Sequence, residues 1–174
     1  GCLCCTVRGD LVDTLSDLYL KRRDGAIPAF DKVVIETTGL ADPVPIIQTV
    51  VTDPELAPLF RLDSVVTLVD GVNGALQLDQ HPESVKQAAI ADRMLITKAD
   101  LVQPAAIVTL RQRLARINPG ARIFMVERGA VAPHELFGAA LEDTQTAGQN
   151  VACWLNANGF TDAEILQGGL GLQR

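Results

Sequence analysis

Three cysteines, Cys2, Cys4 and Cys5, lie within four positions at the start of the sequence. Thiolates that are adjacent or two apart can converge on one soft cation and supply up to three of the four ligands of a tetrahedral Zn²⁺. No fourth ligand is evident nearby, and the two histidines, His81 and His134, stay open as candidates that no sequence pattern supports. We therefore predict an open metal site, which suits metal transfer because a closed four-ligand site retains its ion.

Two other interpretations of this cysteine cluster stay open. Close cysteines can form a strained redox disulfide, although the cluster lacks the two-residue spacing of thioredoxin-type motifs. Cysteines are also often small buried apolar side chains. A disulfide framework is not indicated, because the sequence has four cysteines in all and Cys153 is remote from the others.

An acidic residue and a glycine follow the apolar run Val-Val-Ile at residues 33–35, where the sequence continues Glu36-Thr-Thr-Gly39. At the end of a buried strand, the Glu36 carboxylate can engage Mg²⁺ or its waters, and the Gly39 N–H can approach a γ-phosphate closely. These are the groups that a nucleotide hydrolase needs beside the γ-phosphate. The alternative is an ordinary capped turn, since Thr-Thr-Gly is also common in turns.

A second polar segment, Thr-Lys-Ala-Asp at residues 97–100, follows another apolar run at residues 94–96. Asp100 can accept two hydrogen bonds from N1 and N2 of guanine while the stem of Lys98 lies along the base. Adenine presents the wrong donors, so an aspartate here selects guanine by leaving the wrong base unpaired. The alternative is a loop that caps the next helix. The polar segments at residues 36–39 and 97–100 each follow an apolar run, and together they indicate nucleotide binding more strongly than either alone.

Apolar runs alternate with helical patterns along the chain. Turn-bounded apolar runs predict strands at residues 33–35, 64–69, 94–96 and 122–126. Proline in the first turn predicts helices at residues 43–51, 82–91 and 104–117. An earlier helix is predicted from an apolar face and a capping residue: Leu11, Leu15, Leu18 and Tyr19, with Asp10 as the cap. This alternation predicts an α/β fold with a mostly parallel sheet flanked by helices, which binds ligands at the carboxyl ends of its strands.

The order of these motifs resembles that of the CobW-type metallochaperone GTPases, a P-loop GTPase family. Residues 1–11 resemble the family's Gly-Cys-x-Cys-Cys signature and the start of its next helix. Residues 33–43 resemble its Walker B and switch segment, and residues 87–101 resemble its guanine-specificity segment. The three segments are collinear, so the resemblance is specific over about the first hundred residues.

The resemblance implies a P-loop GTPase-like fold, Mg²⁺-dependent hydrolysis of GTP, and delivery of a transition metal, zinc or cobalt, to a client metalloprotein or a metal-cofactor pathway enzyme. It also implies three sets of site residues: Glu36 and Gly39 for catalysis, Thr97, Lys98 and Asp100 for the base, and Cys2, Cys4 and Cys5 for the metal. Nucleotide state would then alter metal affinity, because the cysteine segment and residues 36–39 both border the phosphates in such a fold.

The sequence departs from the family in two respects. The phosphate-loop pattern G-x-x-x-x-G-K-[ST] does not occur, and Thr97 stands where the family more usually has Asn. We therefore expect a fragment without the N-terminal strand and phosphate loop, which alone is inactive although its parent is a GTPase. Residues 1–141 are expected to form a partial nucleotide-binding domain, and residues 142–174 its end or a linker towards a missing C-terminal domain.

Composition narrows the class of protein. The chain has 174 residues, of which 48% are hydrophobic and 21% charged, as in globular domains. A net charge of −6 without a basic stripe argues against a nucleic-acid partner, and no apolar stretch reaches the roughly 18 residues of a membrane span. The absence of a secretory pattern predicts a cytoplasmic protein.

One competing hypothesis has a different functional class. It is a non-catalytic metal-binding or regulatory module of the same fold that has lost its phosphate loop. The sequence does not identify the metal, because cysteine ligands accommodate several soft cations. It also leaves open which client receives the metal and whether the protein forms a homodimer.

Overall fold

The computed structural model describes residues 3–138, with side chains from residue 8 onward. The chain divides into two compact units, Gly1–Leu62 (unit 1) and Asp63–Arg174 (unit 2). No helix in the described residues is long and apolar enough to cross a bilayer. The predicted boundary between residues 141 and 142 lies outside the described residues and stays a prediction.

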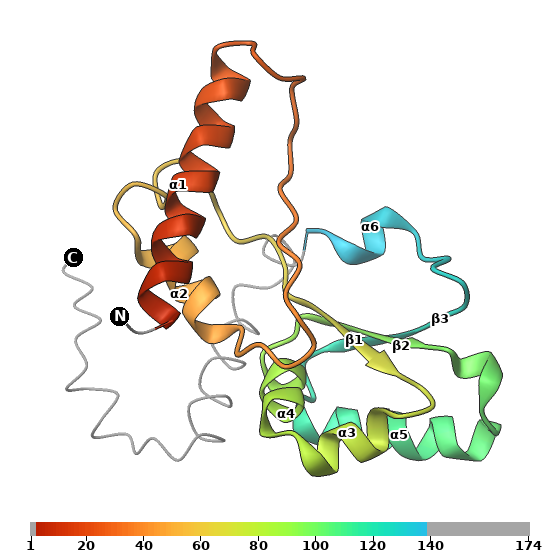
Figure 1. Ribbon diagram of the computed structural model, residues 1–174. Coiled ribbons are helices and arrows are strands. Elements are labelled where there is room, and N and C mark those ends of the chain that lie inside the picture. The colour runs from red at the N-terminus through yellow and green to blue at the C-terminus, as the bar shows by residue number, and fades with distance from the viewer. Residues whose placement is uncertain (1–2, 139–174) are drawn as a thin grey trace, which may run out of the picture. The chain divides into compact units, whose positions relative to one another are not determined.

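Unit 1 is built on two helices, α1 (Leu3–Arg23) and α2 (Val44–Thr52), which pack against each other (Figure 1). Leu15 of α1 and Val50 of α2 are buried together with Leu56, which has no exposed surface. Partly buried apolar side chains surround these three: Leu11, Val12, Leu18, Val33 and Phe60. The predicted apolar face of the first helix is confirmed, because Leu11, Leu15 and Leu18 all face this core.

The prediction that Asp10 caps the first helix was wrong. The helix begins at Leu3, so Asp10 lies in its interior, where the Asp10 carbonyl oxygen accepts a hydrogen bond of 2.6 Å from the Thr14 hydroxyl. The residue with the lowest helix propensity before Asp10 is Gly9, and a single interior glycine costs only about 1 kcal/mol relative to alanine. The helix therefore extends from Asp10 back through Gly9 to Leu3.

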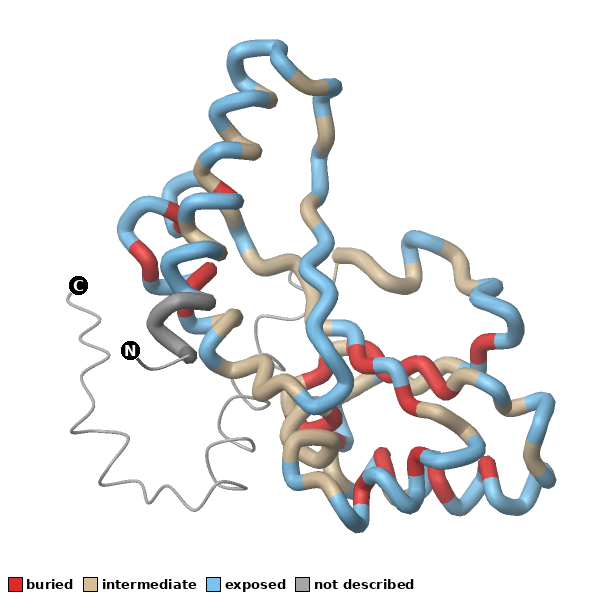
Figure 2. The backbone as a smooth tube through the Cα atoms, viewed as in Figure 1, coloured by how far each residue is buried: buried red, intermediate tan, exposed pale blue. Residues whose placement is uncertain are grey.

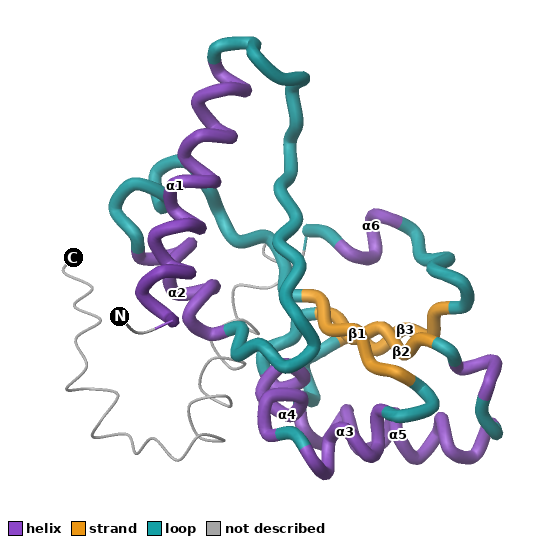
Figure 3. Tube along the Cα trace, viewed as in Figure 1, coloured by secondary structure: helices purple, strands orange, loops and turns teal. Residues whose placement is uncertain are grey.

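The predicted buried strand at residues 33–35 was also wrong. Residues 33–35 belong to the connection between α1 and α2, which Figure 3 draws as loop and Figure 2 as largely exposed. Val33 packs on the unit 1 core, whereas Val34 is 75% exposed. A strand exists only where a neighbouring strand pairs with its N–H and C=O groups. All three strands of the described residues belong to unit 2, and residues 33–35 do not pair with any of them.

Unit 2 contains a parallel sheet with the strand order β1-β2-β3. Its strands are β1 (Val66–Asp70), β2 (Arg93–Thr97) and β3 (Arg122–Val126). Its helical elements are α3 (Gly74–Gln80), α4 (Pro82–Ala89), the 3-10 turn η1 (Ala99–Leu101), α5 (Pro104–Ile117) and α6 (Pro133–Leu136). The predicted α/β fold with a parallel sheet is confirmed, and β3 and α5 match their predicted bounds.

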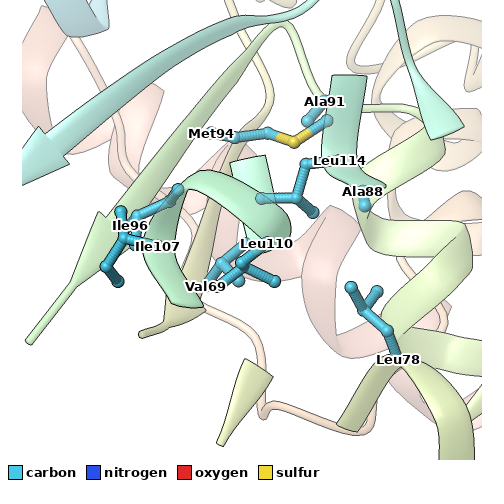
Figure 4. Packing of buried hydrophobic residues seen from close by; sticks show 9 residues of the cluster. All are labelled: Val69, Leu78, Ala88, Ala91, Met94, Ile96, Ile107, Leu110 and Leu114. Atoms are coloured by element: carbon cyan, nitrogen blue, oxygen red, sulfur yellow. The ribbon is translucent and has the colours of Figure 1, made fainter. Parts of the chain in front are cut away.

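The main core of unit 2 lies between the sheet and helices α3, α4 and α5 (Figure 4). Met94 and Ile96 of the central strand are fully buried against Leu114 of α5. Complete burial of a large apolar side chain contributes roughly 1.5–3 kcal/mol, so this strand anchors the unit. The polar segment at residues 97–100 therefore starts from a rigid support.

A buried asparagine joins α4 to the connection between α5 and β3. The side-chain amide nitrogen of Asn118 donates to the carbonyl oxygens of Ala88, Ala89 and Ala91 at 3.1, 2.9 and 2.8 Å. Its side-chain oxygen accepts the Gly120 N–H at 3.2 Å. One side chain thus donates to carbonyl groups at the end of helix α4 and just after it, where the helix ladder stops. Asn118 also ends α5, as the sequence predicts.

Candidate functional site at the carboxyl ends of the strands

The carboxyl ends of the three strands lie at one edge of the sheet. Asp70 pairs with Thr97 across β1 and β2, and Thr97 pairs with Val126 across β2 and β3. The loops that begin after these residues therefore start side by side. Ligands of parallel α/β sheets bind at this edge, so the register identifies the region to examine.

The segment predicted to bind the base forms a tight turn at this edge. Lys98 has left-handed backbone angles (φ 55, ψ 27) and precedes η1, which contains Asp100. The side chain of Thr97 is half-buried and its hydroxyl donates to the Val69 carbonyl oxygen at 3.4 Å, whereas Lys98 and Asp100 are exposed. The turn thus presents an ammonium group and a carboxylate within three residues. Their role in base binding stays a prediction.

Asp70 belongs to the same site, although sequence reasoning did not select it. The Lys98 ammonium nitrogen donates to Asp70 Oδ2 at 2.6 Å. Asp70 Oδ1 accepts the backbone N–H groups of Val72 and Asn73 at 2.8 and 3.1 Å. The hydrogen bond from Lys98 is the main cause that holds the pKa of Asp70 below its usual value. An available signal was that Asp70 ends an apolar run and precedes a glycine.

Gly71 brings the β1 turn into direct contact with the β2 loop. Its N–H donates to the Thr97 carbonyl oxygen at 2.8 Å. A Cβ atom at this position would lie 2.7 Å from the same oxygen, a distance that real Cβ atoms do not reach. Only glycine therefore allows the turn after β1 to pack so closely on the backbone of residues 97 and 98.

The loop after β3 has an unusual backbone conformation. Arg128 and Gly129 follow one another with φ values of 50 and 77, and the Ala130 N–H closes the turn on the Glu127 carbonyl oxygen at 2.9 Å. Left-handed geometry is rare for a residue other than glycine and concentrates at functional sites. Two of the three loops at this edge thus contain a left-handed non-glycine residue, Lys98 in one and Arg128 in the other.

The residues predicted to act on phosphate lie in unit 1. Glu36 and Gly39 are exposed in the loop before α2, where the Ala41 N–H donates to the Thr38 carbonyl oxygen at 3.0 Å. Glu36 borders an open pocket of about 340 Å³ that is lined by Asp10, Leu11, Thr14, Ile35, Glu36 and Ile46. Two carboxylates and a hydroxyl at one pocket are oxygen donors of the kind that Mg²⁺ prefers.

The predicted metal site lies mostly outside what the structure describes. Cys2 is outside the described residues, and Cys4 and Cys5 lie in the first turn of α1 without a description of their side chains. His81 stands between α3 and α4, and His134 lies in α6. Among the side chains of residues 8–138, no group of three or more His, Cys, Asp or Glu residues could hold a metal ion.

Comparisons with known proteins agree with the motif order. Residues 1–125 match the family model described as "CobW/HypB/UreG, nucleotide-binding domain". The zinc chaperone YjiA of Escherichia coli (strain K12) is 42% identical over 131 residues, which cover 75% of this chain and 40% of that protein. The zinc chaperone CobW of Pseudomonas aeruginosa is 30% identical over 165 residues, covering 82% of this chain and 42% of that one.

A solved structure extends this similarity to the fold. The crystal structure of Zn(II)-bound YjiA GTPase from E. coli superimposes with a TM-score of 0.66 at 40% identity, covering 73% of this chain and 39% of that chain. A zinc-regulated GTPase metalloprotein activator of Schizosaccharomyces pombe is 35% identical over 74% of this chain and 30% of its own length. The chain thus spans less than half the length of these relatives.

Proposed function

Because the chain belongs to the CobW/HypB/UreG nucleotide-binding family, we propose that the protein binds and hydrolyses GTP and uses the nucleotide to control a bound transition metal. The metal is cargo: zinc is the first candidate, since two of the relatives are named zinc chaperones, with cobalt as the second. Delivery goes to a client protein that needs the metal. The observation that carries the proposal is the exposed Lys98–Asp100 turn at the carboxyl edge of the sheet in a chain of this family.

Asp100 is the residue that distinguishes guanine. Its carboxylate is exposed, so it can accept the N–H groups at N1 and N2 of the base. Lys98 contributes its aliphatic stem along the base, and Thr97, half-buried at the end of β2, supports the start of the turn. Because β2 is the buried central strand, the turn is held in place before the nucleotide arrives.

Glu36 and Gly39 act at the phosphates. Glu36 would hold Mg²⁺ or its waters, and Asp10, which lines the same pocket, would offer a second carboxylate. When bound, Mg²⁺ neutralises charge that develops on the transferred phosphoryl group. Gly39 has no side chain, so its backbone can approach the γ-phosphate closely. Residues 36–39 are exposed, which allows them to change conformation with nucleotide state.

We expect Glu36→Gln in the full gene product to lower GTP turnover about a hundredfold or more while changing GTP affinity only a few fold. The amide keeps the shape of the carboxylate but loses the charge that engages the metal–phosphate centre. Turnover is measured by phosphate release, and affinity by displacement of a fluorescent GDP analogue. Glu55→Gln, which neutralises another exposed glutamate of unit 1, should leave both quantities unchanged.

Two results would contradict this assignment. Equal turnover in Glu36→Gln and the unmodified protein would remove Glu36 from the catalytic machinery. Absence of any GTP turnover in the unmodified full gene product would favour the non-catalytic metal-binding or regulatory module instead.

Helix α1 supports the coupling between nucleotide and metal. Cys4 and Cys5 lie in its first turn, and Asp10 and Thr14, about one and a half and two and a half turns after Cys5, line the pocket that Glu36 borders. Five residues of a helix span about 7.5 Å, so a shift of the helix caused at the pocket also moves the cysteine backbone. Nucleotide-dependent changes at Glu36 would then change how well Cys2, Cys4 and Cys5 converge on a metal.

For the metal, we expect the triple substitution of Cys2, Cys4 and Cys5 by Ser to abolish tight zinc binding by the reduced protein. Thiolates bind after losing their protons, so the affinity of the unmodified protein should fall as the pH is lowered. The measurement is a competition titration against a chromogenic zinc chelator at two pH values. Cys153→Ser is the matched control and should bind zinc as the unmodified protein does. Undiminished affinity in the triple variant would rule out the cysteine cluster as the metal site.

A further inference from the structure

The ion pair between Lys98 and Asp70 has no role in the function proposed so far. Lys98 is the residue whose stem would lie along the base, yet its ammonium group is fixed 2.6 Å from a carboxylate of the neighbouring strand. The side chain of Lys98 is 55% exposed and that of Asp70 19% exposed. A long lysine side chain would otherwise sample many rotamers at this edge.

Asp70 is itself held in place. Its second oxygen accepts the N–H groups of Val72 and Asn73, and the strand register sets it beside Thr97. The close packing of Gly71 on the Thr97 carbonyl oxygen fixes the separation of the two loops. The carboxylate that receives Lys98 is therefore a fixed point, not a mobile surface charge.

The backbone of Lys98 limits where its side chain can go. Its left-handed conformation turns the chain sharply at the end of β2, and the Leu101 N–H closes this turn on the Lys98 carbonyl oxygen at 3.1 Å. The four-carbon stem of Lys98 is thus held at both ends, by the backbone of the turn and by the ammonium group on Asp70. Such a stem offers a preformed apolar surface to a flat base.

We infer that Asp70 is a positioning residue for purine recognition: it fixes Lys98 so that the stem forms one wall of the base site while Asp100 reads the guanine edge. This role rests on the proposed binding of GTP. It makes the turn after β1 part of the specificity apparatus, although Asp70 itself does not contact the base. The ion pair contributes little to folding, because the lysine partner is more than half exposed and solvent weakens the attraction.

The test measures GTP affinity in the full gene product for Asp70→Asn, Lys98→Ala and the double variant. Asparagine retains an oxygen for the Val72 and Asn73 N–H groups but presents no negative charge to Lys98. We expect Asp70→Asn to weaken GTP binding about fivefold, the scale of one exposed charge pair, with an unchanged melting temperature. In the Lys98→Ala background the same change should have no further effect, because the side chain that Asp70 positions is gone.

Two control variants distinguish the positioning role of Asp70 from the loss of any surface ion pair. Asp79→Asn breaks another ion pair of unit 2, the one to Arg113 at 2.7 Å, and should leave GTP affinity unchanged. Asp70→Glu keeps the charge and should retain more affinity than Asp70→Asn. If Asp70→Asn does not fold, the loss in Asp70→Glu and its disappearance in the Lys98→Ala background provide the same test.

Different results would contradict the positioning role of Asp70 and the proposed binding of GTP. Equal losses from Asp70→Asn with and without Lys98, or no loss at all, would overturn the positioning role while GTP selectivity remained. No preference for GTP over ATP in the unmodified protein would overturn the proposed function and this inference together.

Discussion

Asp100→Asn in the full gene product should weaken GTP binding about a hundredfold or more, because two charge-assisted hydrogen bonds of about 1.5–3 kcal/mol each are lost. The asparagine amide would present donors to the N1 and N2 donors of guanine. Xanthine carries a carbonyl group where guanine has its amino group, so the variant should bind xanthosine triphosphate better relative to GTP. Asp100 is exposed, so the substitution should change nucleotide binding without disturbing the core.

Nucleotide selectivity is measured by competition of GTP, xanthosine triphosphate and ATP against a fluorescent GDP analogue. Asp79→Asn serves as control, because it removes a different exposed aspartate of unit 2 and should keep the GTP preference. Unchanged GTP affinity in Asp100→Asn would show that Asp100 does not read the base.

The largest effect on stability is expected from Asn118→Asp. Asn118 is 2% exposed, and its amide nitrogen donates to three carbonyl oxygens, two in the last turn of α4 and one just after it. An aspartate of the same shape would oppose these oxygens with a carboxylate and could donate nothing while ionised. We expect a loss of about 3–5 kcal/mol in the free energy of unfolding at neutral pH, a large share of the stability of a small domain.

Urea unfolding followed by circular dichroism gives this free energy. Asn73→Asp is a matched control, because Asn73 is exposed at the N-terminal cap of α3, where an acidic side chain is favourable. The control should unfold at the urea concentration of the unmodified protein or slightly above it. Coincident unfolding curves for Asn118→Asp and the unmodified protein would contradict the role of the amide.

Several elements could be predicted because their signals are local. Helix α5 has proline in its first turn and is ended by Asn-Pro-Gly, so both of its bounds followed from the sequence. The turn at residues 97–100 places its three predicted ligands within four positions, so their proximity needs no information about distant residues. By contrast, the N-terminal bound of α1 was wrong, because Asp10 has the composition of a cap but the helix ladder continues before it.

The strand at residues 33–35 could not be decided locally. Its apolar, β-branched residues fit a strand, yet strand formation depends on partners elsewhere in the chain, and the described sheet pairs only β1, β2 and β3. The surroundings of Glu36 therefore became known only from the tertiary structure. Glu36 lines a pocket of unit 1 together with Asp10 and Thr14, and it does not follow a strand of the sheet.

The sequence by itself determined the family, the α/β alternation and the candidate residues for base, phosphate and metal, because each depends on residue types at short spacing. Only the tertiary structure joined Asp70 to Lys98, which are 28 residues apart. That contact arises from the parallel register of β1 with β2 and from the close approach at Gly71. Register is a property of two paired strands, so no pattern within either strand could have specified which carboxylate would meet the lysine.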